Sequence, residues 1–401
     1  GIHMFTYLTA YKTAEQPPQI QPQQPAGFSF NIPLNVPEPD PIPEQVLFEP
    51  NRLGYPETIT YAHRADALNP GRTFGIDFQQ LAVKMHNFIL AYGHWTNVTE
   101  MHQHYEVFQI PKASGGLRTI KAPKPELKAA QTEAKKCLES MGLLPHNAAF
   151  AYVKQRSTKH ALQKHQQNDS VWYLKLDIKD FFDNCNPNLA KTMLLKIFQF
   201  AWLQKHYPTV TERFLNLIIH LNTYGDSFPQ GTPLSPLLTN LIIIPFDYHM
   251  STYSGGGFVY TRYADDILLS HQESFKFTNV QVRVHEILRN MEYPFVIKES
   301  KTRYGSNKGK NWNLGLMLNK DNNITIGHRK KKNLKAVLHC FLTAPLQFNL
   351  EDTQVFLGQL AVYNHTEPEA YSRFMQFIKQ KYNLTKDPTD LVIDHIKALQ
   401  Q

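Results

Sequence analysis

Cysteines are few in this chain of 401 residues, and long apolar runs are lacking; each shortage excludes a class of protein. The three cysteines, Cys137, Cys185 and Cys340, are odd in number and far apart, which favours reduced core thiols over disulfides or a zinc site. No apolar run reaches membrane-spanning length and no signal peptide is visible, so we expect a cytoplasmic protein without a membrane partner. The residues Gly1-Ile2-His3 before Met4 are typical of a cloning scar.

Lysine and arginine are absent from residues 16–50, a stretch that contains ten prolines. Such a composition cannot build a packed core, so we assign residues 4–56 to a Pro-rich N-terminal extension. A disordered tail is one interpretation of this extension. The other is a segment that docks onto the body or onto a second copy of the chain in a homo-oligomer, because apolar residues alternate through part of it: Phe28, Phe30, Ile32, Leu34 and Val36.

Over the whole chain, basic residues are in excess, with a formal net charge of +8 at pH 7. This charge favours a polyanionic partner such as nucleic acid. The chain length and the 42% hydrophobic content fit two or three globular domains with a sizeable core.

Two adjacent aspartates interrupt the apolar stretch Phe258–Ser270, which reads FVYTRYADDILLS. The flanking residues predict a β-hairpin with Asp265 and Asp266 at its tip. Two neighbouring carboxylates beside core-forming residues repel each other and are costly to desolvate unless a cation neutralises them. Mg²⁺ suits such a site, because it binds one or two carboxylates together with water and phosphates. For the Asp pair alone, a polar turn is the alternative.

A second acidic strand is predicted at Trp172–Phe182, which reads WYLKLDIKDFF. Apolar residues alternate with polar ones there, so Asp177 lies near the end of a half-buried strand. Two strands would then offer Asp177 and Asp265 to one site. Such a pair can hold two cations for in-line phosphoryl transfer to a 3′-hydroxyl.

Three motifs in this order resemble the palm of a known family. They are Asp177 with Phe181-Phe182, the sequence PQGTPLSP at 229–236, and the sequence YADD at 263–266. Together they resemble reverse transcriptases of the bacterial retron and group II intron lineage, including its defence-associated branch. The resemblance implies an RNA-directed DNA polymerase that uses dNTPs and Mg²⁺, or alternatively Mn²⁺, held by the three aspartates.

The implied fold is α+β, a right-hand polymerase with fingers, a palm of antiparallel sheet plus helices, and a helical thumb. We expect residues 57–170 to form N-terminal helices and fingers, and residues 171–305 to form the palm with part of the fingers. Residues 306–401 would form the primer grip and thumb. Periodicity predicts helices at 76–92, 126–141, 189–202, 211–221, 234–250 and 277–291, and further helices from residue 328 onward.

A hairpin is predicted from strands at Tyr105–Ile110 and Leu117–Lys121, joined by a glycine-rich turn. Lys112 and Arg118 stand on either side of that turn. By the resemblance, this pair clamps the triphosphate of the incoming nucleotide, whose charge a basic pair can offset. Two solvated surface charges are the alternative.

Three more residues take nucleotide-side roles from the resemblance. The ring of Phe182 would lie beneath the sugar and leave no room for a 2′-hydroxyl. Gln230 would lie against the nucleotide and the template. Lys301 would be the general acid that protonates the leaving pyrophosphate, although a surface lysine is equally consistent with the sequence.

By the resemblance, Arg156 contacts the template or structures the fingers, and Gly315 belongs to the primer grip and contacts the primer strand. A basic helix is predicted to add further nucleic-acid contacts. Residues 298–335 contain eleven lysines and arginines against two acidic residues. Four of them open the predicted helix: Arg329, Lys330, Lys331 and Lys332. A basic helix after the palm can follow a duplex through its phosphates. In isolation it could be a solvated face.

Two positions depart from the usual retron pattern. The Asn-Ala-x-x-His signature is replaced by His160-Ala161-Leu162-Gln163-Lys164-His165, and Val-Thr-Gly is replaced by Asn313-Leu314-Gly315. We expect RNA template and RNA–DNA duplex as partners, with a dedicated non-coding RNA and an effector protein in antiphage defence as further hypotheses. Template-independent or protein-primed DNA synthesis of the abortive-infection type, and a catalytically silent RNA-binding scaffold, are the alternative functions.

Overall fold

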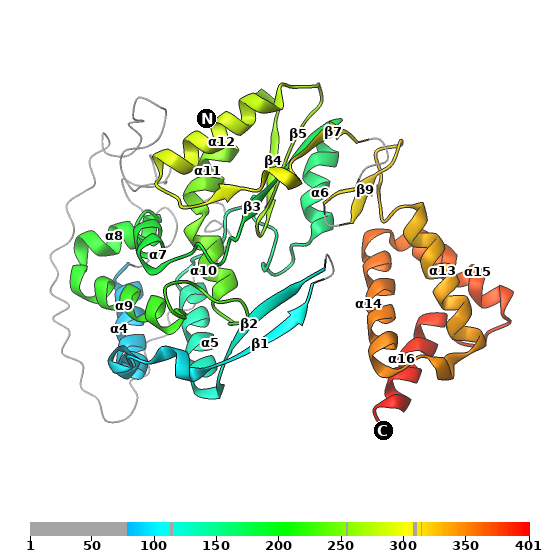
Figure 1. Cartoon of the computed structure of the whole chain (residues 1–401), viewed down its shortest axis with the longest axis horizontal. Coiled ribbons are helices and arrows are strands. Elements are labelled where there is room, and N and C mark those ends of the chain that lie inside the picture. Colours follow the sequence, from blue (N-terminus) through cyan, green and yellow to red (C-terminus); the bar gives the residue numbers. More distant parts are fainter. Residues whose placement is uncertain (1–77, 113–114, 254–255, 308–310, 314) are drawn as a thin grey trace. The chain divides into compact units, whose positions relative to one another are not determined.

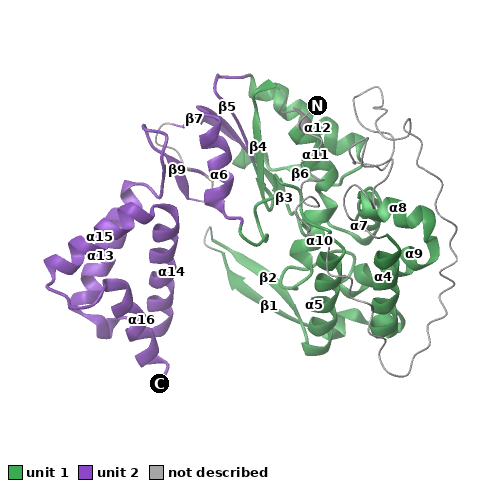
Figure 2. Ribbon diagram, turned by 180° about the vertical axis from the view of Figure 1, so that it is seen from behind, with its two compact units in different colours: residues 1–155, 176–267, 276–302 green, residues 156–175, 268–275, 303–401 purple. Residues whose placement is uncertain are grey.

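The computed structural model describes residues 78–112, 115–253, 256–307, 311–313 and 315–401. The expected cloning scar, the Pro-rich extension and its alternating apolar segment lie outside these residues. The chain divides into two compact units, which are coloured separately in Figure 2. Unit 1 gathers the described residues up to Gln155 with 176–267 and 276–302, and unit 2 gathers 156–175, 268–275 and 303–401.

Unit 1 is mainly helical around one part of a sheet. Its helices are α4 (Phe78–Tyr92), α5 (Pro125–Ser140), α7 (Pro187–Leu194), α8 (Phe198–His206), α9 (Pro208–Leu221), α10 (Ser235–Ile242), α11 (Ile244–Tyr253) and α12 (Phe277–Asn290) (Figure 1). Helix α4 packs on α9, where the rings of Phe88 and Phe214 meet edge to face at 5.6 Å between centroids. The predicted helices at 76–92, 126–141, 211–221 and 277–291 are confirmed over their described residues.

Two predicted helices are wrong in one respect, because each is broken into two. The predicted helix at 189–202 is divided between α7 and α8, and four consecutive residues at the break, 197–200, are all buried. At the break the amides of Lys196 and Ile197 donate to carbonyls only three residues back, those of Met193 and Leu194, at 3.1 and 3.0 Å, so the α-helical hydrogen-bond pattern ends there. The predicted helix at 234–250 is divided into α10 and α11 just before Pro245, which lacks the N–H that a helix interior needs.

Strand β3 (Trp172–Lys179) is central to the main sheet, whose order is β4-β5-β3-β6. Its partners are β4 (Val259–Tyr263), β5 (Asp266–His271), the short β6 (Val296–Ile297) and β7 (Arg303–Ser306), and β6 and β7 both pair with β3 antiparallel. The predicted catalytic hairpin is therefore confirmed as β4 and β5. Helices together with antiparallel strands also confirm the α+β class.

A separate hairpin in unit 1 consists of β1 (Tyr105–Pro111) and β2 (Leu117–Pro123), paired antiparallel with Ile110 opposite Arg118. The predicted strand, loop and strand are confirmed. Short 3-10 helices lie at Gly93–Asn97, Met101–His104, Glu299–Lys301 and Pro345–Gln347.

Unit 2 combines helix α6 (Thr158–Gln167), a three-stranded sheet and four C-terminal helices. The sheet order is β10-β9-β8, from β8 (Asn311–Asn313), β9 (Leu316–Leu318) and β10 (Ile324–Thr325). The helices are α13 (His328–Thr343), α14 (Leu350–Thr366), α15 (Pro368–Lys381) and α16 (Pro388–Leu399). The predicted apolar side of α13 is confirmed, since Leu334, Leu338 and Phe341 are buried in a cluster with Phe356 of α14.

All three cysteines are free thiols, as expected from their number. Cys185 is buried and Cys137 is half-buried, but Cys340 is exposed on α13, so the expectation of a core thiol is wrong there. None of the described helices combines the length and the apolar character needed to cross a lipid bilayer.

Candidate active site

The end of β3 is fixed on both sides by backbone hydrogen bonds. The amide of Ile178 donates to the carbonyl of Asp265 at 2.9 Å, and the amide of Lys298 donates to the carbonyl of Asp177 at 2.7 Å. These bonds attach the tip of the β4–β5 hairpin and the chain after β6 to the same two residues of β3. Asp177 and Asp265 are therefore brought to one place, as the sequence predicted.

The tip of this hairpin contains a backbone conformation that is unusual for its residue. Ala264 has φ +54°, in the left-handed region that normally favours glycine. A left-handed alanine costs on the order of 1–2 kcal/mol, so neighbouring contacts must hold the turn. The two residues that follow are Asp265 and Asp266.

Repulsion and burial shape the electrostatics of the carboxylates. Burial, reinforced by the charges of Asp177 and Asp266, raises the pKa of Asp265 to about 7. Lys301 opposes this repulsion, with Nζ 3.2 Å from Oδ2 of Asp177. The hydrogen bond to Asp177 raises the pKa of Lys301 in turn, although its side chain is 54% exposed and the pair is screened by solvent. The sequence-predicted set of Asp177, Asp265 and Lys301 is thus clustered.

The aspartates fit a divalent cation by their chemistry. Oδ1 of Asp177 is buried and has no hydrogen-bond partner, and such an oxygen is costly without a cation or a donor. Across the described ranges, no three His, Cys, Asp or Glu side chains converge as a cage for one ion. Sites for Mg²⁺ need only one or two carboxylates, because water and substrate phosphates complete the shell. The arrangement therefore suits a metal that binds together with a nucleotide.

The raised pKa of Asp265 makes stability depend on pH. An unfolded aspartate has a pKa of about 3.9, so the folded state binds more protons between that pH and about pH 7, and the metal-free protein loses stability as pH rises through this window. We expect Asp265→Asn to raise the free energy of unfolding at pH 8 by about 2 kcal/mol, and to have little effect at pH 4. Calorimetry in EDTA at both pH values measures this difference.

The exposed Asp226 offers a control, since Asp226→Asn removes a carboxylate that is not buried. Equal effects of the two substitutions at pH 8 would contradict the account of Asp265.

Phe182 lies just beyond β3 and is half-buried, whereas Phe181 is buried. Their rings meet edge to face at 5.6 Å, so the prediction that at least one of them is core is confirmed. The loop with Gln230 lies against β2, since the carbonyl of Gln230 accepts from the amide of Lys121 at 3.0 Å. Gly231 next to it has φ +109°, and a Cβ there would come within 2.8 Å of the Ile120 side chain. Only glycine permits this close approach.

Lys112 and Arg118 are exposed at the end of the β1–β2 hairpin. Arg118 and Asp265 both influence one side chain, that of Tyr152. Burial and the nearby Tyr263 and Asp265 raise the pKa of Tyr152, while Arg118 lowers it. Tyr152 has φ +60°, in the left-handed region. The sequence analysis missed this residue, and the only signal for it was its place in the motif before Arg156.

Residues predicted to contact nucleic acid are found in unit 2. Burial lowers the pKa of Arg156. Gly315 has φ +90°, and its carbonyl accepts a hydrogen bond from Nζ of Lys330 at 3.0 Å. Lys331 is paired with Glu367 at 2.6 Å, so part of its charge is already compensated within the unit.

A groove of about 920 Å³ lies beside the start of α13. Its lining combines basic residues with an apolar floor and includes Arg329, Lys330, Lys332, Leu316, Leu334 and Val362. A surface of this kind can hold a phosphate backbone beside sugar or base atoms. This placement is consistent with the predicted role of α13.

His165, the second histidine of the altered retron signature, is buried in unit 2. Its Nδ1 is hydrogen-bonded to Oγ of Ser270, which donates to Oγ of Ser170 at 2.7 Å. Burial lowers the pKa of His165 to about 3, so the ring is neutral at physiological pH. His165 is therefore a hydrogen-bonded link between α6 and β5.

The sequence analysis also missed a buried ion pair behind the hairpin. Arg262 of β4 and Asp247 of α11 are both fully buried and are joined at 2.8 Å. A signal was present for Asp247, which is the only Asp, Glu, Lys or Arg in residues 227–261. An isolated buried charge requires a partner.

Comparison with known families gives one match that covers more than half of the chain. The family described as "Reverse transcriptase (RNA-dependent DNA polymerase)" matches residues 110–358. The match includes all three aspartates, Lys301 and the basic start of α13.

Individual proteins are similar over different lengths. The retron Mx162 reverse transcriptase of Myxococcus xanthus is 35% identical over 42% of this chain, but over only 36% of that protein. The retron Ec83 reverse transcriptase of Escherichia coli is 26% identical over 70% of this chain and 87% of that protein. Among solved structures, apo telomerase from Candida tropicalis aligns with a TM-score of 0.43 and 12% identity, over 78% of this chain and 68% of that chain.

Proposed function

Because the chain belongs to the reverse transcriptase family, we propose that it extends a 3′-hydroxyl on an RNA template with dNTPs. The observation that carries this proposal is the pairing of Asp177 with Asp265, one from the end of β3 and one from the hairpin tip, with a buried carboxylate oxygen that has no hydrogen-bond partner. The raised pKa of Asp265 supports it, because perturbed carboxylates cluster at functional sites.

Asp177 and Asp265 would hold divalent cations, Mg²⁺ or alternatively Mn²⁺, with Asp266 assisting. When bound, such cations activate the attacking 3′-hydroxyl and stabilise the leaving pyrophosphate in a two-metal mechanism. Lys301 would deliver a proton to the leaving pyrophosphate, and its raised pKa keeps it protonated at neutral pH.

Four residues of unit 1 would bind the incoming nucleotide. Lys112 and Arg118 would clamp the triphosphate from the β1–β2 hairpin. Gln230 would lie against the base pair, in a loop whose backbone is fixed to β2. Phe182 would exclude the 2′-hydroxyl of an NTP.

Template and primer would be held largely through phosphates. An RNA–DNA duplex would be contacted by Arg156, Gly315 and the first turn of α13. In that turn Arg329, Lys330 and Lys332 are exposed, and Lys331 also forms an ion pair with Glu367. The fingers, palm and thumb boundaries expected from the sequence are part of this proposal. A dedicated non-coding RNA as template, an effector protein as partner and a role in antiphage defence are extensions that rest on the likeness to retron proteins.

Extension of a labelled primer on defined RNA tests the proposal. The protein is incubated with an RNA template, an annealed DNA primer, Mg²⁺ and either dNTPs or NTPs. Template-length DNA made from dNTPs is the expected product. Nucleic acid that copurifies from the native host is then sequenced after separate RNase and DNase treatment, where one discrete RNA joined to DNA would identify the template. Absence of DNA product on primed RNA under every metal and nucleotide condition would exclude the proposed activity.

Replacing Phe182 by alanine is expected to relax sugar selection. Removal of the ring opens space for a 2′-hydroxyl, so incorporation of NTP relative to dNTP should rise by about 10²-fold. Single-nucleotide kcat/KM values for matched dNTP and NTP measure the ratio. Phe182→Tyr keeps the ring and serves as the matched control, which should retain the wild-type ratio.

A further inference from the structure

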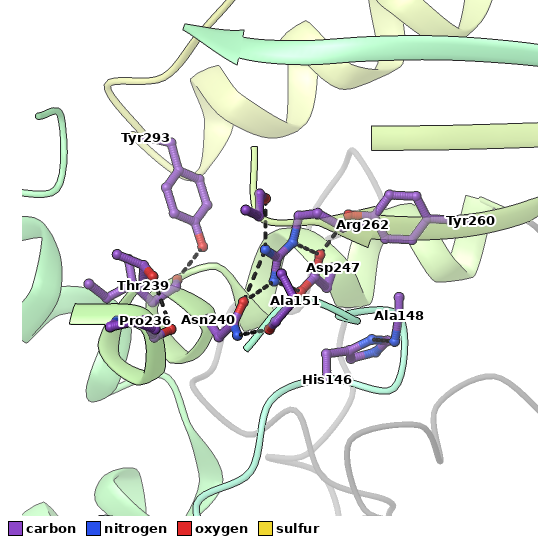
Figure 3. Close-up of polar contacts among 12 residues, drawn as sticks. His146, Ala148, Ala151, Pro236, Thr239, Asn240, Asp247, Tyr260, Arg262 and Tyr293 are labelled. Atoms are coloured by element: carbon purple, nitrogen blue, oxygen red, sulfur yellow. Dashed lines mark hydrogen bonds and ion pairs between the residues drawn. The ribbon is translucent and has the colours of Figure 1, made fainter. Parts of the chain in front are cut away.

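The guanidinium of Arg262 lies at the centre of the network drawn in Figure 3. A guanidinium has five N–H donors, and five hydrogen bonds of this group are present. Nε and one terminal nitrogen donate to the two carboxylate oxygens of Asp247, at 2.9 and 2.8 Å. Both terminal nitrogens donate to Oδ1 of Asn240, at 3.1 and 3.2 Å. The fifth bond goes to the carbonyl of Ala264, at 2.9 Å.

The acceptors of this network are fixed from the other side. The hydroxyl of Tyr260 donates to Asp247 at 2.6 Å, and the side-chain amide of Asn240 donates to the carbonyl of Ala151 at 2.9 Å. Arg262 and Asp247 are both without solvent exposure. In such a site the guanidinium cannot rotate without leaving a buried donor unpaired.

The backbone of Arg262 is held as firmly as its side chain. Its amide donates to the carbonyl of Ala148 at 2.7 Å, and its carbonyl accepts from the amide of Phe150 at 2.9 Å. Both the backbone and the side chain of Arg262 are therefore held in place, two residues before Ala264 at the hairpin tip.

The hydrogen bond to Ala264 connects the buried ion pair to the hairpin tip. Ala264 is the residue with the left-handed backbone, and its carbonyl belongs to the peptide that leads into Asp265. On the far side of the tip, the Asp265 carbonyl is bound by the amide of Ile178. The turn is thus held at two successive carbonyls, one by Arg262 and one by β3.

We propose that Arg262 is a positioning residue, which holds the Ala264 carbonyl and thereby sets where the carboxylates of Asp265 and Asp266 lie during catalysis. This inference rests on the proposed polymerase function. Arg262 acts through the turn and touches no reacting group. Misplacement of reacting groups by about 1 Å is enough to lower a rate about 10²-fold, so a small shift of the turn has a large effect.

Two variants separate positioning from folding. Arg262→Lys keeps the positive charge beside Asp247 but cannot make all five bonds, since an ammonium has three donors. Arg262→Met combined with Asp247→Leu removes both charges and leaves an apolar pair of similar volume, a replacement that buried ion pairs often tolerate. Tyr293→Phe is the control, because it removes a neighbouring buried hydrogen bond, to the Ile242 carbonyl at 2.8 Å, without touching the turn.

Each purified, folded variant is compared with wild type in two measurements. Binding of Mn²⁺ without substrate is followed by electron paramagnetic resonance of the free ion, and kcat on primed RNA is measured across Mg²⁺ concentrations. We expect both Arg262 variants to bind Mn²⁺ at least about tenfold more weakly, and to lose about 10²-fold in kcat. Tyr293→Phe should match wild type in both measurements.

Binding of Mn²⁺ and kcat within twofold of wild type in a folded Arg262 variant would overturn the positioning role. Should Arg262→Lys fail to fold, the double variant decides by the same criteria. The Mn²⁺ measurement stands independently of synthesis. An inactive wild-type protein would therefore count against the proposed function, while weaker Mn²⁺ binding in the variants would still support the role of Arg262.

Discussion

Replacing both Asp265 and Asp266 by alanine is expected to lower DNA synthesis by about 10⁴-fold, equivalent to about 5 kcal/mol of transition-state stabilisation. The reason is that Asp265 and Asp177 are the carboxylates brought together at the end of β3, and no other carboxylate pair of the described site replaces them. Single-turnover primer extension measures the loss. RNA binding should stay within about twofold of wild type, because the expected phosphate contacts lie on other residues.

The double substitution removes a repulsive pair, so the fold should persist, and calorimetry of the same sample verifies it. Asp226→Ala provides a control for general effects of removing an exposed carboxylate. A folded double variant that still polymerises at a rate near wild type would refute the two-metal assignment. If RNA binding disappeared together with synthesis, the aspartates would have a role in RNA binding that the proposal does not include.

Substituting Asp247 by alanine is expected to cost about 3 to 5 kcal/mol of unfolding free energy. The substitution leaves the Arg262 guanidinium buried with two of its five hydrogen bonds unmade and its charge uncompensated. It also removes the acceptor of the Tyr260 hydroxyl. Urea unfolding of the metal-free protein, followed by circular dichroism, gives the change in free energy.

A second pair of variants separates the effect on stability of losing the Asp247 carboxylate from that of leaving the Arg262 charge uncompensated. Adding Arg262→Met to Asp247→Leu should restore most of the stability that Asp247→Leu alone removes, because the uncompensated charge is then gone. A loss of under about 1 kcal/mol in Asp247→Ala would mean that water or a rearranged side chain compensates the charge of Arg262. The network drawn in Figure 3 would then be able to rearrange.

Much of the candidate active site could be predicted because its signals are local. Alternation along Trp172–Lys179 indicated β3, and apolar strands around two aspartates indicated the hairpin. The pairing of Asp177 with Asp265 was predicted from chemistry. The adjacent Asp265 and Asp266 need a cation in an apolar setting, and a second acidic strand could help to bind it. The basic start and the apolar side of α13 were likewise visible in sequence periodicity.

What could not be predicted depends on contacts between residues distant in sequence. Arg262 and Asp247 are 15 positions apart and share no local pattern, so neither suggested the other. Lys331 was predicted with its basic neighbours, and only the fold shows its ion pair with Glu367. The break between α7 and α8 was likewise not visible, because no glycine or proline marks it in the sequence.

The ion pair between Lys301 and Asp177 has a consequence for the protein before any metal binds. The lysine provides a counter-charge from within the chain, so the acidic centre is partly balanced from the moment the chain folds. A cation bound at Asp177 would displace an ammonium whose side chain is 54% exposed, and a screened ion pair of this kind costs less to break than a buried one.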